Sequence, residues 1–338
     1  MRGVSLIELM ISMAIGLMVV AAIGFLYVNS RQTYRQQDNL ARIQENGRFA
    51  LDVMAKDIRM AGFWGCAGRT ISEPVNTLNT PNNYLYAFNI PVQGHEATGT
   101  NTWLPALDGS ITNPLSGSDI ITIRGAFGGG TIVTQHPGGS PPGSADIKTT
   151  PGAPFEEDDI LFVTDCINAA VFQVTNINDQ GSLGVNIAHN TGTGGPPGNA
   201  TKALGKEYTG GEVFRAEVIT YYLRNNPAGR PSLYRITNGT AEELVENVEA
   251  LQINYGIDTN SDRAVDQYTT ADGVADWNQV RAIRIRLLLV SPENNILDQA
   301  QTYRWDTDSD GDLDIVNAPD RRLRYVFSTS VGIRNRLP

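Results

Sequence analysis

Two short runs of acidic residues have the spacing of a cation site. The sharper one carries five carboxylates within nine residues, at Asp306, Asp308, Asp310, Asp312 and Asp314. Calcium loops use oxygen ligands at positions 1, 3, 5 and 9 and a glycine at position 6, so this pattern predicts calcium. Position 12 is Asn317 instead of the usual bidentate glutamate, so weak binding is expected. A solvated acidic turn is the alternative.

A second run has the same spacing but lacks the glycine. Positions 1, 3, 5 and 9 are Asp258, Asn260, Asp262 and Asp266, and Arg263 occupies the sixth position. The spacing again predicts calcium, with less support than in the first run. Because no flanking helix pair is evident, both would be loop sites between strands.

The chain has only two cysteines, Cys66 and Cys166. Their wide separation excludes a CxxC metal or redox motif. In an exported protein one long-range disulfide is the natural interpretation, whereas two buried free thiols would suit a reducing cytosol. Closing so long a loop would contribute roughly 4 kcal/mol in the chain-entropy model.

Enzyme chemistry finds little support. The three histidines are scattered through expected loops and form no HExxH pair: His95, His136 and His189. Neither a GxSxG elbow nor a GxxxxGKS/T phosphate loop occurs, so the chain is expected not to be an enzyme. The formal net charge of -10 argues against nucleic acid as a main partner, because phosphate neutralisation needs a basic face.

The N-terminal segment has the composition of a membrane anchor. After Glu8 no charged residue occurs until Arg31, and Leu9–Ser30 is nearly all apolar. As a helix it would span roughly 33 Å, enough for a bilayer core of about 30 Å. A buried core helix is rarely so apolar on every side, and no A-x-A cleavage site follows, so a lasting anchor fits best. Glu8 is costly at the edge of such a span, and its partner is expected from another chain or a terminal amine.

The residues around Glu8 form a recognisable signal. Arg2–Leu9 (RGVSLIEL) resembles the class III signal of type IV prepilins. The resemblance implies that a prepilin peptidase cuts after Gly3 and that Val4 becomes an N-methylated N-terminus. Glu8 then stands at mature position five, the family's characteristic acid, where it is expected to pair with the N-terminal amine of a neighbouring subunit during filament assembly.

Later segments resemble the PilW-type minor pilins, namely residues 157–175, 214–236, 246–255 and 276–289. The resemblance implies a low-abundance subunit that takes part in initiating type IV pilus assembly, in a tip-located complex that supports twitching motility and adhesion. Implied partners are other minor pilins, the major pilin, a tip adhesin and the prepilin peptidase. The subunit would span the bacterial inner membrane once, with a periplasmic domain, and then enter the filament at the cell surface. Two alternatives stay open: a minor pseudopilin of a type II secretion system, and a tip adhesin that itself binds a surface ligand.

These features predict an α+β fold of the type IV pilin kind, in which a long N-terminal helix packs on an antiparallel sheet. The expected parts are a leader at 1–3, a transmembrane part at 4–30, an amphipathic helix at 31–62 and an enlarged, loop-rich β domain at 63–338. In the amphipathic part, apolar or small residues recur at helical steps, as in Ile43, Gly47, Ala50, Leu51, Met54, Ile58 and Ala61.

The later sequence alternates between β-type runs and glycine-rich segments. Val280–Val290 has the clearest alternation, with arginines expected on a solvated outer face or against an acidic neighbour. Residues 125–154 are rich in glycine and proline and are expected to form loops. Polar residues such as Asp52 and Asp57 are expected on the outer face of the helix.

Overall fold

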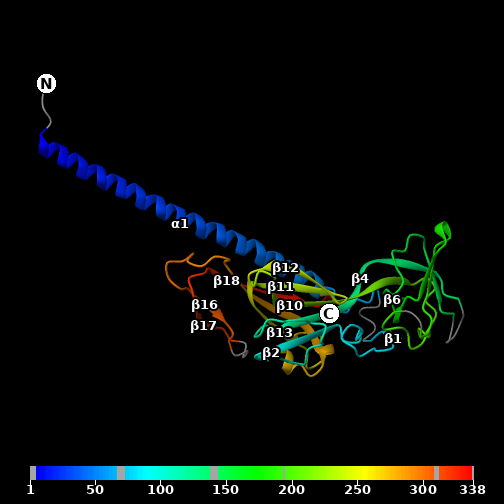
Figure 1. The fold of residues 1–338 in the computed structure, drawn as a ribbon. Coiled ribbons are helices and arrows are strands. Elements are labelled where there is room, and N and C mark those ends of the chain that lie inside the picture. The colour runs from blue at the N-terminus through cyan, green and yellow to red at the C-terminus, as the bar shows by residue number, and fades with distance from the viewer. Residues whose placement is uncertain (1–4, 67–72, 138–143, 193–194, 308–311, 337–338) are drawn as a thin grey trace.

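The protein consists of one long helix and a large domain of β-strands (Figure 1). A computed structural model describes residues 5–66, 73–137, 144–192, 195–307 and 312–336. The helix α1 (Leu6–Arg59) projects alone beyond the globular part and then lies along it. This arrangement confirms the predicted α+β, pilin-like fold.

Local capping accounts for both ends of α1. At the start, the Ser5 hydroxyl accepts a hydrogen bond from the Glu8 amide at 3.3 Å, and the Glu8 carboxylate accepts one from the Ser5 amide at 3.0 Å. This reciprocal pair is a capping box, which satisfies two amides that the first turn leaves open. The helix ends at Arg59, and Gly62 then takes a φ of 64°, a conformation that glycine adopts without steric cost.

Only the second half of α1 packs on the domain. Its buried face includes Ile43, Ala50, Met54 and Ile58, as the periodicity predicts. Gly47 lies so close to the Phe327 ring that an added methyl group would clash with it. Helix and sheet therefore approach closely at this point.

A loop of the domain also contacts α1 closer to its N-terminus. Gln32 and Gln36 both donate to the Ile296 carbonyl, at 2.7 and 2.9 Å, and Arg35 forms an ion pair with Glu293 at 2.6 Å. The domain thus contacts the helix from residue 32 onward.

The larger sheet has twelve strands. Its main path runs β1-β7-β6-β10-β4-β5-β9-β8, while β11 and β12 continue from β10, and β2 and β3 continue from β4. All its pairings are antiparallel except that of β1 with β7. The strands are β1 (Val75–Asn76), β2 (Val92–Gly99), β3 (Thr102–Leu104), β4 (Ile120–Gln135), β5 (Asp146–Thr149), β6 (Ile160–Thr164), β7 (Ala169–Gln173), β8 (Asn176–Asp179), β9 (Val185–Ala188), β10 (Glu212–Asn225), β11 (Pro231–Thr237) and β12 (Thr240–Glu246).

A second, four-stranded antiparallel sheet and a separate hairpin complete the domain. The sheet has the order β14-β13-β15-β18, and the hairpin pairs β16 with β17. The strands are β13 (Val248–Ile257), β14 (Gln267–Thr269), β15 (Val280–Val290), β16 (Thr302–Trp305), β17 (Asp314–Asn317) and β18 (Arg324–Gly332). Four short 3-10 turns are η1 (Gly181–Leu183), η2 (Ala271–Gly273), η3 (Trp277–Gln279) and η4 (Arg334–Arg336).

The strands enclose two main cores. The first joins the buried face of α1 to side chains of β4, β10, β13 and β15, and we call this region the helix-packed body. The second lies between β5, β6, β7 and β9 and the far end of β4, and we call this region the distal lobe. Figure 1 shows β4 running from the body toward the lobe at the end of the molecule away from α1.

The glycine-rich segment departs from the prediction. The loop expected over residues 125–154 contains the second half of β4 and all of β5. β4 pairs with β10 on both sides of Gly128–Gly130, where the register shifts in a bulge, and the Phe214 ring lies where a side chain at Gly130 would be. Glycine here permits a close approach of neighbouring groups instead of ending the strand.

Candidate functional site

The first candidate site is the free part of α1. An 18-residue window of this helix has a mean hydropathy of 2.5 and none of it is buried, so the helix is long and apolar enough to cross a membrane. Large side chains such as Leu17 and Phe25 are exposed along it. A contiguous apolar surface of this size is covered in a working protein, either by lipid or by other chains.

Glu8 lies at the very start of this apolar segment. Its carboxylate caps the Ser5 amide within the same chain, so the side chain has a local partner that the sequence interpretation did not include. Gly3 and Val4, where cleavage and methylation are predicted, lie outside the described residues. Pairing of Glu8 with the amine of a neighbouring subunit therefore stays a prediction.

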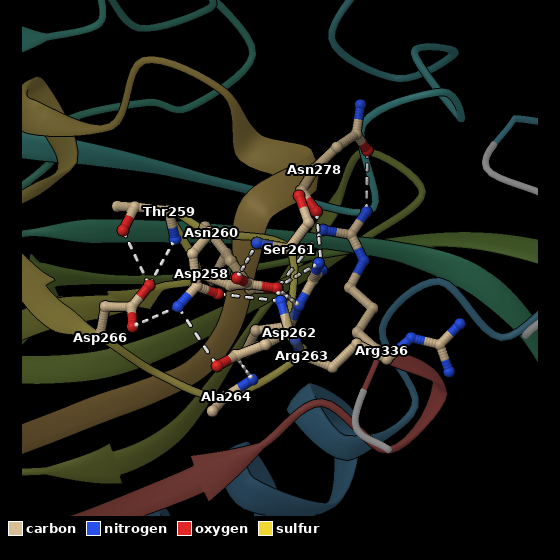
Figure 2. A network of polar contacts seen from close by, with 12 residues as sticks. Asp258, Thr259, Asn260, Ser261, Asp262, Arg263, Ala264, Asp266, Asn278 and Arg336 are labelled. Atoms are coloured by element: carbon tan, nitrogen blue, oxygen red, sulfur yellow. Dashed lines mark hydrogen bonds and ion pairs between the residues drawn. The ribbon is translucent and has the colours of Figure 1, made fainter.

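The second candidate site is the loop from Asp258 to Asp266, drawn in Figure 2. Asp258 is buried, and its carboxylate accepts hydrogen bonds from the amides of Ser261 at 2.6 Å and Arg263 at 3.0 Å. The same carboxylate pairs with the Arg281 guanidinium at 2.9 Å. Burial raises the pKa of Asp258, but the hydrogen bonds from Arg281 and the two amides outweigh it and hold that pKa below its usual value.

The other predicted ligands of this loop also converge. Asp266 accepts from both the amide and the hydroxyl of Thr259, each at 2.7 Å, and these bonds lower the pKa of Asp266. The Asn260 side-chain amide donates to Asp262 at 3.2 Å and to Asp266 at 3.3 Å. The structure thus brings all four predicted oxygen ligands into one hydrogen-bonded loop.

The described part of the first acidic run repeats this plan. Asp306 is buried and faces the Arg286 guanidinium at 3.4 Å, as Asp258 faces Arg281. The Thr307 amide donates to Asp314 at 3.1 Å, its hydroxyl donates to the same carboxylate, and both bonds lower the pKa of Asp314. Asp308 and Asp310 lie outside the described residues. In the described residues, the two runs therefore share two contacts: the first aspartate pairs with an arginine of β15, and the next threonine donates to the last aspartate.

The arginines of β15 do not form the solvated face that was expected. Arg281 and Arg286 pair with the two loop aspartates, and Arg284 stacks on the Tyr268 ring at 4.0 Å from its centroid. The alternative of an acidic neighbour is closer to the structure, but these neighbours belong to the same chain. The alternation of residues placed the arginines on one face and gave no sign of what would cover that face.

These contacts bear on the fit of a cation. Each loop already receives a positive charge from its arginine, and a metal would have to share the first carboxylate with it. Within the described ranges, no three His, Cys, Asp or Glu side chains are grouped so as to hold a metal ion. Calcium in either loop stays a prediction.

The disulfide between Cys66 and Cys166 is present. Cys66 follows the end of α1 by a few residues, and Cys166 lies in the turn between β6 and β7. The bond therefore ties the helix end to strands that contribute to the distal lobe. It is suited to an oxidising compartment outside the cytosol.

Asp57 is a residue whose role the sequence did not reveal. It was expected on the outer face of α1 but is only 8% exposed. Its carboxylate accepts a hydrogen bond from the Tyr221 hydroxyl at 2.5 Å, and the Arg235 guanidinium lies 3.7 Å away. A buried carboxylate with two such partners positions the helix on β10, because both partners lie on the underlying sheet.

A single apolar helix docked on an antiparallel-rich domain is the arrangement of pilin-like proteins. Residues 220–335 match the family model of PilW, the type IV pilus-assembly protein W, and this match supports a PilW-type pilus protein. The matched segment runs from β10 to η4. It contains the second sheet and both acidic loops. No curated protein and no solved structure matches the chain.

Proposed function

We propose that this protein is a minor pilin that helps to initiate type IV pilus assembly as part of a tip-located complex. The observation that carries the proposal is the exposed apolar half of α1 joined to a domain of which residues 220–335 match the PilW family model. The apolar segment would hold the subunit in the inner membrane before it enters the filament core. Tip location, twitching motility and adhesion belong to the proposal, as do other minor pilins, the major pilin and a tip adhesin as partners.

Assembly in this proposal depends on Glu8 and on processing between Gly3 and Val4. In hydrocarbon a carboxylate is far more costly than in water, so a charge contact at Glu8 would set the register between subunits. We expect Glu8→Ala to reach the membrane fraction at normal levels but to be depleted from sheared filaments. Glu45→Ala, an exposed acid on the packed half of α1, is the matched control and should be recovered normally.

Normal recovery of the Glu8→Ala protein in filaments would contradict the assembly role. Deletion of the whole chain separates the alternatives. Loss of surface pili supports a role in initiation, loss of secretion with normal pili would indicate a type II pseudopilin, and normal pili with lost attachment would indicate an adhesin. No catalytic role is proposed.

Calcium is proposed as a weak ligand of the two acidic loops. The contacts that the described residues of the two loops share support the proposal, and the arginine at each first carboxylate explains why binding would be weak. Calcium at millimolar concentration should raise the unfolding temperature of the full-length protein in detergent, and magnesium should do so less. Asp262→Asn and Asp312→Asn should reduce the rise. An unfolding temperature that calcium does not change would remove this proposal.

A further inference from the structure

Two carboxylic acids face each other inside the molecule where the two sheets meet. His95 of β2 and Ile120 of β4 are the last pair of their ladder, and Glu96 and Asp119 are the residues that come next on the two strands. Directly opposed residues of an antiparallel pair have Cβ atoms about 5 Å apart. Each of these two side chains is only 4% exposed.

Asp119 connects the two sheets through its own hydrogen bonds. One carboxylate oxygen accepts from the Ala97 amide of β2 at 3.1 Å, and the other accepts from the Ile253 amide of β13 at 2.8 Å. The Asp119 amide in turn donates to the Leu251 carbonyl of β13 at 2.9 Å. The side chain is therefore part of the contact between the larger sheet and the four-stranded sheet.

The surroundings of this pair make it unfavourable for both carboxyl groups to be ionised at once. Burial is the main cause that raises the pKa of Asp119 well above its usual value, and the charge of Glu96 is the next. Asp272 in η2, the other charged side chain that raises this pKa, is also acidic. Two ionised carboxylates in such a place would repel each other strongly, because little water screens them.

A buried hydroxyl, that of Tyr255, is influenced by the same pair of acids. Tyr255 of β13 is fully buried, and its hydroxyl has no hydrogen-bond partner among the described residues. Burial, followed by the charges of Asp119 and Glu96, raises the pKa of Tyr255, which places the hydroxyl within reach of their field. Its ring is fixed edge-on against Trp277 at 5.0 Å, and the hydroxyl lies against Gly94.

We propose that Glu96 and Asp119 share one proton at neutral pH and form a pH-sensitive latch between the two sheets. The shared proton removes one charge and joins the two carboxyl groups, while Asp119 keeps its bonds to β2 and β13. Loss of this proton to water leaves two adjacent negative charges and weakens the contact. The latch is closed in acid and loosens in alkali.

The sign of the pH dependence follows from the raised pKa of Asp119. Its contribution to stability is complete below the unfolded-state pKa of 3.8 and is lost as the pH rises from there through the folded-state pKa. Asp272 of η2 and Tyr255 of β13 act on the pair from neighbouring elements, and Asp272 adds a further negative charge.

Infrared spectroscopy of the full-length protein in a detergent without carboxyl groups tests the proposal. The exposed carboxyl groups of the protein are ionised at neutral pH, so a band from a protonated carboxylic acid reports a buried acid. We expect this band in the wild-type protein at neutral pH and expect it to disappear as the pH is raised. Asp272→Asn, an exposed acid beside the pair, should keep the band.

The double variant Glu96→Gln, Asp119→Asn should lose the band and should also lose the fall in unfolding free energy that the wild type shows with rising pH. Absence of the band in the wild type at neutral pH would overturn the proposal without the need for any variant. A band that persists in the folded double variant would overturn it as well. The proposal would also be overturned if calcium removed the band and raised the unfolding temperature. A cation would then hold the pair in place of the proton.

Discussion

The helix-packed body and the distal lobe are built from the same long strands but are stabilised differently. In the body, α1 covers the sheets, and a buried acid, Asp57, fastens it to Tyr221. The described residues of the distal lobe contain no α-helix, and the lobe is held by strand pairing, a small apolar core and the nearby disulfide. The family match begins in β10 and covers only part of the body, whereas the core residues of the lobe all precede it.

Buried titratable groups extend this difference. The body contains the acidic pair Glu96 and Asp119, which favours a bound proton. The lobe contains His189, which is fully buried, has no hydrogen-bond partner for either ring nitrogen among the described residues, and favours the neutral form. Between about pH 4 and 6.5 acid should therefore stabilise the contact in the body and destabilise the lobe. The comparison teaches that the two regions can respond in opposite directions to one change of solvent.

The largest expected effect concerns the bond that joins the two regions. Cys66→Ser with Cys166→Ser should lower the free energy of unfolding by about 2–5 kcal/mol, because a loop of this length is then free in the unfolded chain. Hydrogen exchange should rise in β6 and β7 before it rises in β13 and β15. Equal protection of both regions, with and without the disulfide, would show that the body and the lobe unfold as one unit.

A smaller effect is expected from Asp57. Asp57→Ala leaves the buried Tyr221 hydroxyl without its acceptor and should cost about 1–3 kcal/mol in urea unfolding. Asp52→Ala is the matched control on the same helix, where the side chain is 75% exposed and the change should be within about 0.5 kcal/mol. Similar costs for the two variants would mean that Asp57 does not position α1 on the sheet.

Within one pH unit below 6.5, the smallest effect concerns the lobe. The pKa of His189 is lowered to about 3, mainly by burial and also by the nearby charges of His136 and Lys202. Stability from the neutral ring is complete above pH 6.5 and falls by at most about 1.4 kcal/mol per pH unit as the pH drops toward 3.

Hydrogen exchange of β9 should therefore speed up in mild acid. His189→Phe should remove most of this acceleration and leave exchange in β13 unchanged. If acid slowed hydrogen exchange in β9 as much as in β13, the proposed contrast between the two regions would be wrong.

The sequence predicted those features that depend on local pattern. The bounds of β15 agree with the alternation of Val280–Val290, and the buried face of α1 follows the helical period. The spacing of Asp258, Asn260, Asp262 and Asp266 predicted a calcium site, which stays a prediction, although Asn260 does donate to both Asp262 and Asp266.

Features that depend on the pairing of segments far apart in the sequence could not be predicted. Asp57 is buried because β10 supplies Tyr221 from far along the chain. Glu96 and Asp119 meet only because β2 and β4 pair in one particular register. The glycines of β4 indicated a loop, but they form a bulge in a strand that pairs with β10 on both sides of them.

The hydrogen bonds and the ion pair that the domain forms with Gln32, Arg35 and Gln36 have a mechanical consequence. The free segment of α1 above it is about 39 Å long at roughly 1.5 Å per residue, and no joint separates it from the packed half. A force on the apolar end is therefore transmitted to the domain through one continuous helix. The loop at Ile296 holds this helix against tilting. Force applied during extraction from a membrane would act on the whole body at once.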